Sequence, residues 1–403
     1  MHILLVHRYY WPDTPAYAAM LHIMAKHLVK SGHKVSVFST QPCYNGVYLD
    51  EASPAYEVVD GVEIYRTPLL RESKKKPIIR AINVGLFCVS LLLHCLLRFR
   101  KYNVMTVSSF PPVLMGMMAR IICFFSRMKY IYHCQDLYPE VALNSGVMRS
   151  KWVAAITARI DRRNCQKAQH VVVLSQDMLD TVVKRGVSKD HIRVINNFTI
   201  ASFDNQIRPP ADLELEKGKF RVLFAGNLGR FQNLSAVMEA AEQMKDQNEI
   251  QFWFVGDGAM KKELEKQAVD MRDRTVFFRP FLPMKQVMAV IADSHLSIVS
   301  LSPGVIECAY PSKTMTYLEA GCRLLVLVEP SSSLARFVRD NEIGSVCEDY
   351  SAASIVAAVT TEFTNWKGGQ IDRQAIQQLG ADNFSQKATL SRWDDLLEEI
   401  RPL

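Results

Sequence analysis

The stretch "FRVLFAGNLG" (220–229) decides the fold: an apolar run leads into a turn that contains two glycines, and a helical pattern follows. The same unit recurs along the chain. Apolar runs of this kind are "HILLVH" (2–7), "GHKVSVFST" (32–40), "VMTVSS" (104–109), "KYIYHC" (129–134), "HVVVLS" (170–175), "IQFWFVGDG" (250–258), "VFFRPF" (276–281), "HLSIVSL" (295–301), "RLLVLVE" (323–329) and "GSVC" (344–347). Continuous apolar runs that alternate with amphipathic helices are typical of parallel strands buried on both faces.

A polar stretch, "TIASFDNQIRPPADLELEKGK" (199–219), divides this series into two. It lacks apolar periodicity and contains a Pro-Pro pair, so we interpret 201–219 as a linker. The sequence therefore predicts two doubly wound α/β domains in tandem, over 1–200 and 220–383. No strand follows the last helical segment, and we expect 384–403 to pack back on the first domain.

Composition narrows the class of protein. The 403 residues are 49% hydrophobic and carry a net charge of +7, which favours an anionic partner such as a phosphate, a nucleotide or a membrane surface. We expect no nucleic-acid partner. The nine cysteines are scattered without a CxxC pair, and the N-terminus has no cleavage site of a signal peptide. Both features predict a cytoplasmic protein with free thiols.

The segment 74–101, "KKKPIIRAINVGLFCVSLLLHCLLRFRK", is apolar over 81–97 and basic at both ends. Asn83, Ser90 and His94 are spaced so that they form one polar stripe on a helix. A single membrane crossing here would put strands of one sheet on opposite sides of the bilayer. We therefore predict an interfacial helix whose cations meet anionic lipid headgroups. The alternative is an ordinary core helix with a basic surface.

Several enzyme classes lose their main support. The first strand-to-helix turn, "HRYYWPDTPAYAA", lacks the G-x-G-x-x-G of dinucleotide-binding oxidoreductases. The sequence also lacks a P-loop, HExxH, GxSxG and a Cys-His metal spacing. These absences argue against P-loop kinases, zinc peptidases and serine hydrolases.

In the second domain, "GNLGRFQN" (226–233) follows a strand and precedes a helix. Gly226, Asn227 and Arg230 in such a turn form a candidate phosphate cradle, and a plain loop with a surface arginine is the alternative. The similar turn "VGDG" (255–258) carries Asp257, whose charge would repel phosphate. We interpret that turn as a sharp bend with a helix N-cap.

The stretch "PSKTMTYLEAG" (311–321) predicts a short helix capped by Ser312, with Lys313 in its first turn and Glu319 near its end. A phosphate at the N-terminus would meet backbone N–H groups and Lys313. Glu319, on the face of Ser312 and about 10 Å further along by helix rise, can accept hydrogen bonds from two sugar hydroxyls. The segment would then bind a nucleotide at both ends. The alternative is a pair of solvated charges.

The first domain places polar residues where a strand ends, in "YHCQDLYPE" (132–140), which includes His133, Asp136 and Glu140. This edge of an open α/β sheet is where ligands bind. "VINNF" (194–198) adds Asn196 and Asn197, whose side-chain amides bind hydroxyls well. Each of these residues can equally serve as a cap or turn residue.

Taken in order, these motifs resemble the retaining family-4 glycosyltransferases of the GT-B fold, and within them the bacterial surface-polysaccharide enzymes. The resemblance runs almost from end to end. Its pieces are "GHKVSVFST", "DGVEIYRTP" (60–68), "SSFPP" (108–112), "QDLYPE" (135–140), "VVVLSQDMLDTVVKRGV" (171–187), "IRVINNF" (192–198), "FAGNLGRFQNL" (224–234), "VGDG" and "PSKTMTYLEAG". It implies two Rossmann-like domains with a cleft between them, an acceptor in the first and a nucleotide-sugar in the second.

The resemblance also implies roles in the second domain. Glu319 matches the second glutamate of the family's E-x7-E motif, which grips the ribose, while Pro311 occupies the place of the first. Glu307 is the nearest acid to that place. Arg230 and Lys313 would share the charge of the diphosphate. No DxD acid pair is present, so we expect no cofactor and a metal-independent departure of the diphosphate.

In the first domain, Asp136 ranks above His133 and Glu140 as the group that orients the acceptor or the donor sugar. The implied reaction moves a hexosyl or N-acetylhexosaminyl group from a nucleotide-diphosphate sugar to a lipid-diphosphate-linked saccharide, at the inner face of the cytoplasmic membrane. Two alternatives are a nucleotide-sugar 2-epimerase of the same fold and a catalytically inactive membrane-associated scaffold.

Overall fold

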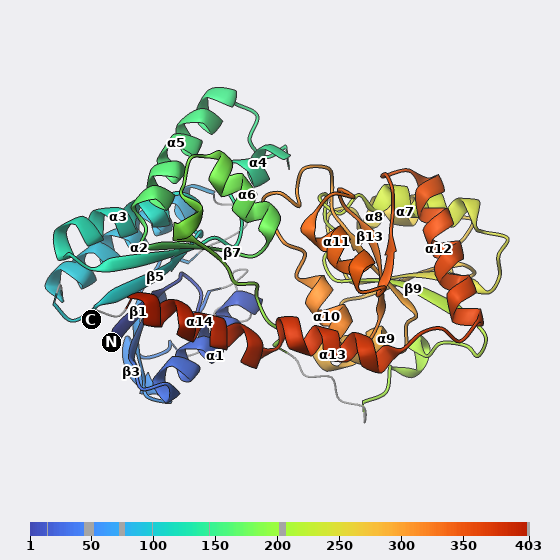
Figure 1. Cartoon of the computed structure of the whole chain (residues 1–403), viewed down its shortest axis with the longest axis horizontal. Coiled ribbons are helices and arrows are strands. Elements are labelled where there is room, and N and C mark those ends of the chain that lie inside the picture. Colours follow the sequence, from blue (N-terminus) through green and yellow to red (C-terminus); the bar gives the residue numbers. More distant parts are fainter. Residues whose placement is uncertain are drawn as a thin grey trace. The chain divides into compact units, whose positions relative to one another are not determined.

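Two sheets organise the chain, which a computed structural model describes over residues 1–13, 15–43, 52–71, 77–98, 100–144, 146–200 and 207–400. The chain divides into two units. The first comprises Met1–Leu143, Met148–Ile200 and Thr389–Leu403, and the second comprises Asn144–Val147 and Ala201–Ala388. Each unit is Rossmann-like, with helices on both faces of its sheet, so the predicted fold class is confirmed (Figure 1).

The sheet of the first unit has the strand order β3-β4-β2-β1-β5-β6-β7-β8. Its strands are β1 (His2–Val6), β2 (Lys34–Thr40), β3 (Tyr56–Val59), β4 (Val62–Thr67), β5 (Val104–Ser108), β6 (Lys129–His133), β7 (His170–Val173) and β8 (Ile192–Val194). All neighbours are parallel except β3 and β4, which pair antiparallel at the edge. The central strands are buried on both faces, as continuous apolar runs require.

The helices of this unit are α1 (Ala16–Lys30), α2 (Pro77–Leu97), α3 (Leu114–Ser126), α4 (Glu140–Asn144), α5 (Lys151–Lys167), α6 (Gln176–Lys184) and α14 (Gln386–Ile400), with a 3-10 turn at Lys189–His191. Helices α1 and α14 share one core with the sheet. On the other face, Phe38 of β2 packs against Phe87 of α2, and Tyr130 of β6 donates to the Asn164 carbonyl of α5.

The C-terminal helix α14 belongs to the first unit although it follows the whole second unit in sequence. Leu390, Trp393, Leu396, Leu397 and Ile400 are all buried in the core that also contains α1. Their spacing of three and four residues places them on one face of the helix. No strand follows α14 in the sequence. Its apolar face is buried because the helix packs against the sheet of the first unit.

Helix α2 places its polar stripe inward. Asn83 is fully buried and exchanges hydrogen bonds with the Leu70 backbone N–H and carbonyl at 2.9 and 2.8 Å. His94 lies 2.8 Å from the Tyr102 hydroxyl, and Ser90 accepts from Thr67. The outer face is therefore apolar, with large side chains that are 41–79% exposed: Ile78, Ile82, Leu86, Val89, Leu93, Leu96 and Leu97. This is not the basic outer surface that the core-helix alternative expected.

Among the described residues, Ile78–Leu97 is the one helix that meets the length and composition of a membrane span, with a mean hydropathy of 1.9 and 33% of it buried. A buried helix of a soluble protein meets the same criteria. The distinguishing observation is where the apolar residues point, since most of them face outward here.

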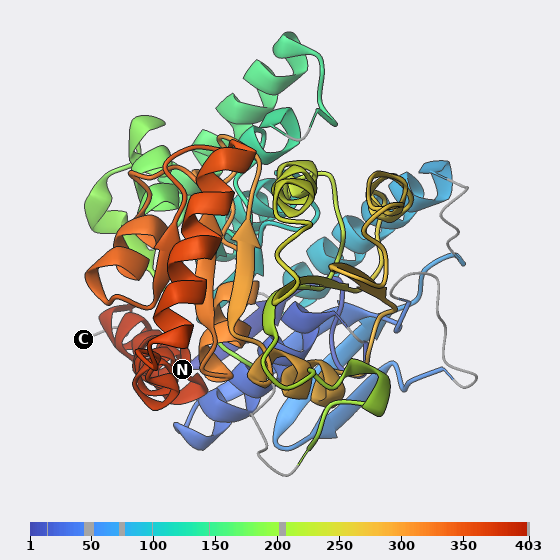
Figure 2. The same cartoon turned by 90° about the vertical axis from the view of Figure 1, so that its right-hand side faces the viewer.

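The second unit has a fully parallel sheet in the order β11-β10-β9-β12-β13-β14. Figure 2 shows this unit facing the viewer. Its strands are β9 (Phe220–Ala225), β10 (Ile250–Val255), β11 (Val276–Arg279), β12 (Leu296–Ser300), β13 (Arg323–Leu327) and β14 (Gly344–Val346). Its helices are α7 (Leu234–Gln243), α8 (Lys261–Gln267), α9 (Met284–Ala292), α10 (Lys313–Glu319), α11 (Ser333–Asp340), α12 (Ala352–Lys367) and α13 (Arg373–Phe384). One core lies beneath α7, α8 and α12, and the other beneath α9, α10, α11 and α13.

The described part of the predicted linker, 207–219, is packed against this second unit. Leu213, in the 3-10 turn Ala211–Leu213, is buried in its core. Arg221 donates to the Leu213 carbonyl at 2.6 Å, and Asp293 accepts from the Leu215 N–H at 3.2 Å. The described residues of this segment are therefore held against the second unit by one buried side chain and by backbone hydrogen bonds.

Candidate functional site

The loops that follow β9 and β10 are joined by backbone hydrogen bonds. The Gly226 N–H donates to the Val255 carbonyl and the Leu228 N–H to the Asp257 carbonyl, both at 2.8 Å. A Cβ at Gly256 would lie 1.9 Å from the Gly226 oxygen, and one at Gly258 would lie 2.3 Å from the Leu228 oxygen. Only glycine fits at these two positions, and the loops form one rigid edge.

The predicted cap in this region is wrong. The Asp257 carboxylate accepts from the adjacent Gly258 N–H, while α8 begins at Lys261 with Met260 at its cap position. The close approach of the two glycine loops, and not helix capping, accounts for the "VGDG" turn.

Lys313 of α10 lies directly beside Gly226. A Cβ at Gly226 would be 2.9 Å from the Lys313 Cε and 3.4 Å from its Nζ. The Nζ lies 4.4 Å from the centre of the Phe224 ring, a cation–π contact. Burial lowers the pKa of the Lys313 ammonium to about 8. Lys313 forms no ion pair with any described residue, so a cation lacks a counter-charge where β9 ends.

Tyr317 sets the position of that lysine. It lies one turn after Lys313 on α10, is fully buried, and accepts from the Ala225 N–H at 3.0 Å. Its hydroxyl also lies 3.3 Å from the Ala225 carbonyl. These bonds hold α10 against the end of β9. Tyr317 was not among the predicted site residues, although its spacing of four residues from Lys313 places the two on one side of the helix.

The rest of α10 presents a second face. Ser312 is exposed, and Thr316 and Glu319 are half-buried, while Met315 is buried. Ser312, Thr316 and Glu319 therefore share the outward face, as their spacing predicted, and Lys313 points away from it toward Gly226. Ser312 occupies the N-cap position with helical dihedrals and makes no side-chain capping bond, so the predicted cap is wrong.

Other predicted residues lie in the surrounding loops. Asn227, Arg230 and Glu307 are exposed, and the Arg230 side chain forms no hydrogen bond or ion pair among the described residues. The Gly229 N–H donates to Gln232 at 2.6 Å. Glu329, which was not among the predicted residues, accepts from the Gly304 N–H at 2.5 Å and fixes the loop before α10.

In the first unit, His133 lies inside a hydrogen-bonded cluster where β6 ends. Its Nδ1 is 3.0 Å from the Tyr17 hydroxyl, and its Nε2 is 2.8 Å from the Gln135 amide nitrogen. Since that amide donates, Nε2 is the acceptor and Nδ1 carries the proton. Burial lowers the pKa of His133 to about 3, so the ring is neutral near pH 7. Both ring nitrogens are engaged within the protein.

The cluster extends to the asparagines of "VINNF". The Asn197 amide donates to Gln135 at 2.7 Å, and the Asn197 N–H donates to the Asn196 side chain at 2.7 Å. The Gln135 and Asp136 N–H groups both point at Ser109 Oγ, at 3.1 and 3.4 Å. Asp136 forms no ion pair with a described residue, and burial raises its pKa to about 6.

Glu140 is bound to an arginine outside this cluster. Its two carboxylate oxygens accept from the Arg185 guanidinium, which also donates to Asp161 at 2.7 Å and to the Tyr138 carbonyl at 3.1 Å. A bidentate ion pair of this kind fixes the start of α4 against the end of α6. Of these two carboxyl groups, Glu140 thus has an internal partner, and Asp136 has no ion pair with a described residue.

The described residues include no group of three or more His, Cys, Asp or Glu side chains arranged to hold a metal ion. The metal-independent reaction stays a prediction.

The edges of the two sheets differ chemically. The edge at Lys313 offers a cation for an anionic ligand. The edge at His133 offers amides, hydroxyls and a carboxyl group suited to hydroxyl-rich ligands.

Comparison with known proteins identifies both units. Residues 16–197 match the family model described as a glycosyl transferase 4-like domain, and residues 206–378 match the model of glycosyl transferases group 1. The chain is 24% identical over 391 residues to the putative colanic acid biosynthesis glycosyl transferase WcaI of Escherichia coli (strain K12). That match covers 94% of this chain and 96% of WcaI.

Solved structures share the fold. Sucrose-phosphate synthase from Thermosynechococcus elongatus has a TM-score of 0.74 at 14% identity, covering 99% of this chain and 98% of that one. Anabaena HepE in complex with UDP has a TM-score of 0.68 at 14% identity, and the match covers 99% of this chain and 100% of HepE. The chain thus carries, in sequence order, both domains of a glycosyltransferase of the GT-B type.

Proposed function

We propose that this protein is a retaining glycosyltransferase that moves a hexosyl or N-acetylhexosaminyl group from a nucleotide-diphosphate sugar to a lipid-diphosphate-linked saccharide, in the synthesis of a bacterial surface polysaccharide. One observation carries the nucleotide half of this proposal. Lys313, beside Gly226 where β9 ends, is a largely buried ammonium without a counter-charge among the described residues. A diphosphate supplies that charge.

The comparisons support the same class of donor and product. HepE, a structural neighbour, is described in complex with UDP, and the relative WcaI is named for colanic acid biosynthesis. During transfer, negative charge grows on the departing diphosphate. A cation placed in advance, in a site partly shielded from water, stabilises that charge strongly. Lys313 is suited to this role, and the exposed guanidinium of Arg230 is a second candidate.

In the proposed reaction, the bond between the anomeric carbon and the diphosphate oxygen breaks. A bond from an acceptor hydroxyl to the same carbon forms on the same face, which retains the configuration. The hydroxyl proton passes to the departing phosphate oxygen. Asp136 would orient the acceptor hydroxyl or the donor sugar by accepting a hydrogen bond, while neutral His133 supports the loop from behind through Gln135.

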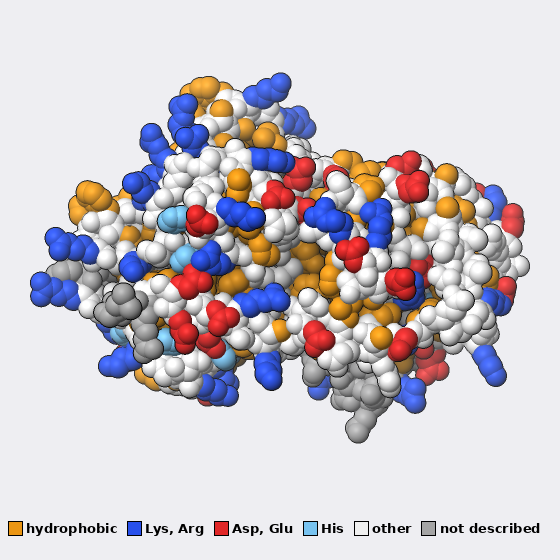
Figure 3. All heavy atoms as spheres, in the orientation of Figure 1, with side chains coloured by type: hydrophobic (Ala, Val, Ile, Leu, Met, Phe, Trp, Pro, Cys, Tyr) orange, Lys and Arg blue, Asp and Glu red, His pale blue; other side chains and the backbone are white. Residues whose placement is uncertain are grey.

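Helix α2 supports the lipid-linked acceptor and a peripheral location on the inner face of the cytoplasmic membrane. It presents a row of exposed large apolar side chains, and Arg80, Arg98 and Arg100 stand near its two ends. On the face drawn in Figure 3, further Lys and Arg side chains gather around α5, with hydrophobic atoms at the surface between them. Apolar side chains bordered by cations fit an anionic bilayer surface.

A transfer assay tests the reaction. The protein is incubated with a panel of labelled UDP-, GDP- and ADP-sugars, with and without a bacterial membrane lipid extract. We expect label from one donor to enter the lipid fraction, and Lys313→Met to abolish this. Epimerised nucleotide-sugar formed without acceptor would identify the epimerase instead. A protein that binds none of UDP, GDP and ADP by calorimetry would be the inactive scaffold.

A sedimentation assay tests the membrane contact. The double variant Leu86→Glu with Leu93→Glu places two charges on the exposed face of α2. We expect it to stay in the supernatant with vesicles containing phosphatidylglycerol at low salt, while the wild-type protein sediments. Val269→Glu, at a 70% exposed position in the second unit, is the matched control and should sediment normally. Equal sedimentation of all three proteins would contradict the α2 contact.

A further inference from the structure

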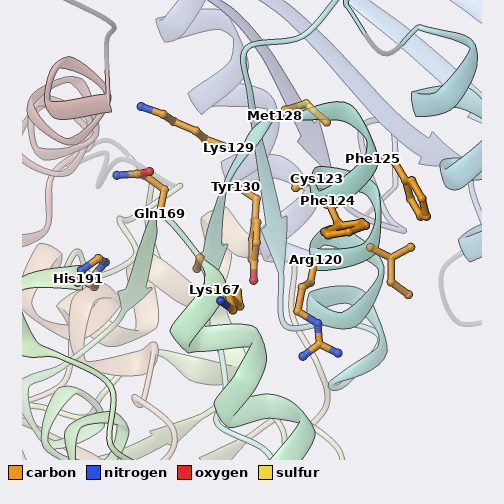
Figure 4. A pocket seen from close by; sticks show the side chains of 12 residues that line it. Arg120, Cys123, Phe124, Phe125, Met128, Lys129, Tyr130, Lys167, Gln169 and His191 are labelled. Atoms are coloured by element: carbon orange, nitrogen blue, oxygen red, sulfur yellow. The ribbon is translucent and has the colours of Figure 1, made fainter.

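A cavity of about 620 Å³ opens in the first unit at the edge where its strands begin. It lies between the end of α3, the end of α5 and the first residues of β6 and β7 (Figure 4). The candidate catalytic residues lie where strands end, for example Asp136 after β6. The cavity is therefore at the opposite edge of the sheet from the site described above, and the proposed transfer reaction leaves it unused.

The lining of this cavity combines apolar and cationic side chains. Phe124 and Phe125, at the end of α3, are 80% and 65% exposed, and their rings form an edge-to-face pair at 5.3 Å. Met128 and the Tyr130 ring continue the apolar wall. The exposure of two adjacent phenylalanine side chains to water is unfavourable. An exposed apolar patch of this kind marks a surface that contacts an apolar partner.

Three cations, Arg120, Lys129 and Lys167, line the same cavity, and none of its described lining residues is acidic. The side chains of Arg120 and Lys167 make no hydrogen bond or ion pair within the part of the chain described, and the Lys129 ammonium donates only to the Ile400 carbonyl, at 3.3 Å. Arg120 comes from α3 and Lys167 from α5, and Figure 4 shows them on either side of the Tyr130 ring. Two cations from different helices can contact one phosphate from both sides.

We propose that this cavity binds a single anionic glycerophospholipid, with its phosphate between Arg120 and Lys167 and an acyl chain along Phe124, Phe125 and Met128. This inference rests on the membrane part of the proposed function. A free sugar phosphate would satisfy the cations and leave the phenylalanines in water. A neutral lipid would cover the phenylalanines and leave the cations unpaired. An anionic amphiphile satisfies both halves of the lining.

The neighbouring elements favour this occupant. Helix α3, which carries Arg120 and both phenylalanines, packs directly against α2 with its exposed apolar row. A lipid bound in the cavity would therefore lie beside the surface proposed to contact the bilayer. The lipid would hold the first unit to the membrane through a specific contact, in addition to the general attraction of the basic surface.

The test uses calorimetry of the full-length protein with dihexanoyl phosphatidylglycerol below its critical micelle concentration. We expect one molecule to bind, and the double variant Arg120→Gln with Lys167→Gln to weaken this at least about tenfold. The matched control is Arg127→Gln, an exposed cation one residue before Met128 that does not line the cavity. It should bind within about twofold of the wild-type protein. Far-UV circular dichroism and urea unfolding that match the wild-type protein show that each variant is folded.

Two further probes separate the possible sources of binding. Dihexanoyl phosphatidylcholine has the chains without the net charge, and glycerol-3-phosphate has the charge without the chains. Equal binding of either one, equal weakening in Arg127→Gln, or no binding of phosphatidylglycerol would overturn the lipid site. A protein that transfers sugar and sediments with vesicles but fails these tests contradicts this inference alone. A protein that binds phosphatidylglycerol but transfers no sugar contradicts the proposed reaction alone.

Discussion

The two units end their central strands in opposite ways. Where β9 ends, Lys313 approaches Gly226 and has no counter-charge among the described residues. Where β6 ends, His133 has both ring nitrogens hydrogen-bonded, to Tyr17 and to Gln135. One edge carries an uncompensated cation, and the other carries a satisfied network around neutral His133, beside the carboxyl group of Asp136.

This difference teaches what each edge is prepared to bind. A buried cation without a partner destabilises the free protein. An anion that binds there is attracted by the charge, and its binding also removes this destabilisation. A satisfied network costs little and holds its neighbours rigidly, which suits the positioning of uncharged hydroxyl groups. The predictions below test whether the edge at Lys313 is the nucleotide site and the edge around His133 and Asp136 is the positioning site.

The largest effect is expected from Lys313→Met, which removes the cation and keeps the length of the side chain. UDP or GDP affinity, measured by calorimetry, should fall about 100-fold, which corresponds to about 3 kcal/mol for a charge-assisted contact. Lys266→Met, an exposed lysine on α8, should change affinity less than about twofold. An unchanged affinity in Lys313→Met would show that the diphosphate does not bind at this edge.

Gly226→Ala should have the next largest effect. Its Cβ would meet the Lys313 Cε at 2.9 Å, and the φ of +125° is a conformation that L side chains rarely adopt. We expect a loss of about 1–3 kcal/mol in the free energy of unfolding from urea titration, with nucleotide affinity about tenfold weaker. Gly218→Ala has a φ of +83° with nothing within 4 Å, so it should cost about 1 kcal/mol and leave affinity intact. Equal affinities in the two variants would contradict the contact.

The pH dependence of transfer compares Asp136 with His133. Burial raises the pKa of Asp136 to about 6, so its carboxylate is lost as the pH falls through about 6. Activity should fall in that range if the carboxylate orients a substrate. His133, with a pKa of about 3, stays neutral across it. His133→Gln should therefore keep the acid limb of the profile at reduced rate. Loss of that limb in His133→Gln would assign it to the histidine.

The smallest effect concerns stability. The pKa of Lys313 in the folded protein, about 8, lies below its ordinary value of 10.5, so the unfolded chain binds more protons between these values. The destabilisation is full below about pH 8 and fades as the pH rises toward 10.5. Lys313→Met should therefore raise the free energy of unfolding by about 1 kcal/mol at neutral pH. A gain that does not shrink toward pH 9.5, about the upper limit of such a titration, would contradict this origin.

The fold could be predicted because its strands are continuous apolar runs separated by helical periodicity. Strands β3, β4 and β8 were not predicted. In β3 and β4 the burial alternates along the strand, and β8 has only three residues, so none of them forms a continuous apolar run. The orientation of α2 also could not be predicted. Its polar stripe was visible, but Asn83 and His94 find partners in Leu70 and Tyr102, which only the fold brings near.

The candidate site was predicted in part. Gly226 and Lys313 were each singled out from local motifs, and the structure brings them together although 87 residues separate them. The surroundings of His133 could not be read from its motif, because Tyr17 comes from α1 and Trp393 from α14. Likewise, Glu140 finds Arg185 at a separation of 45 residues. Local motifs identify candidate groups, and tertiary partners decide which of them are already engaged.

The central claim is that Lys313 receives the diphosphate as an ammonium ion. Calorimetry of UDP binding at about pH 8.5, in buffers with different ionisation enthalpies, measures the protons taken up on binding. The phosphate groups of UDP are fully ionised there, since their last pKa is about 6. Lys313 is partly deprotonated in the free protein and should gain a proton when UDP binds, so the wild-type protein should take up a substantial fraction of one proton. Lys313→Met should take up none at the concentrations where it still binds. Binding without proton uptake, or equal uptake by Lys313→Met, would contradict the account.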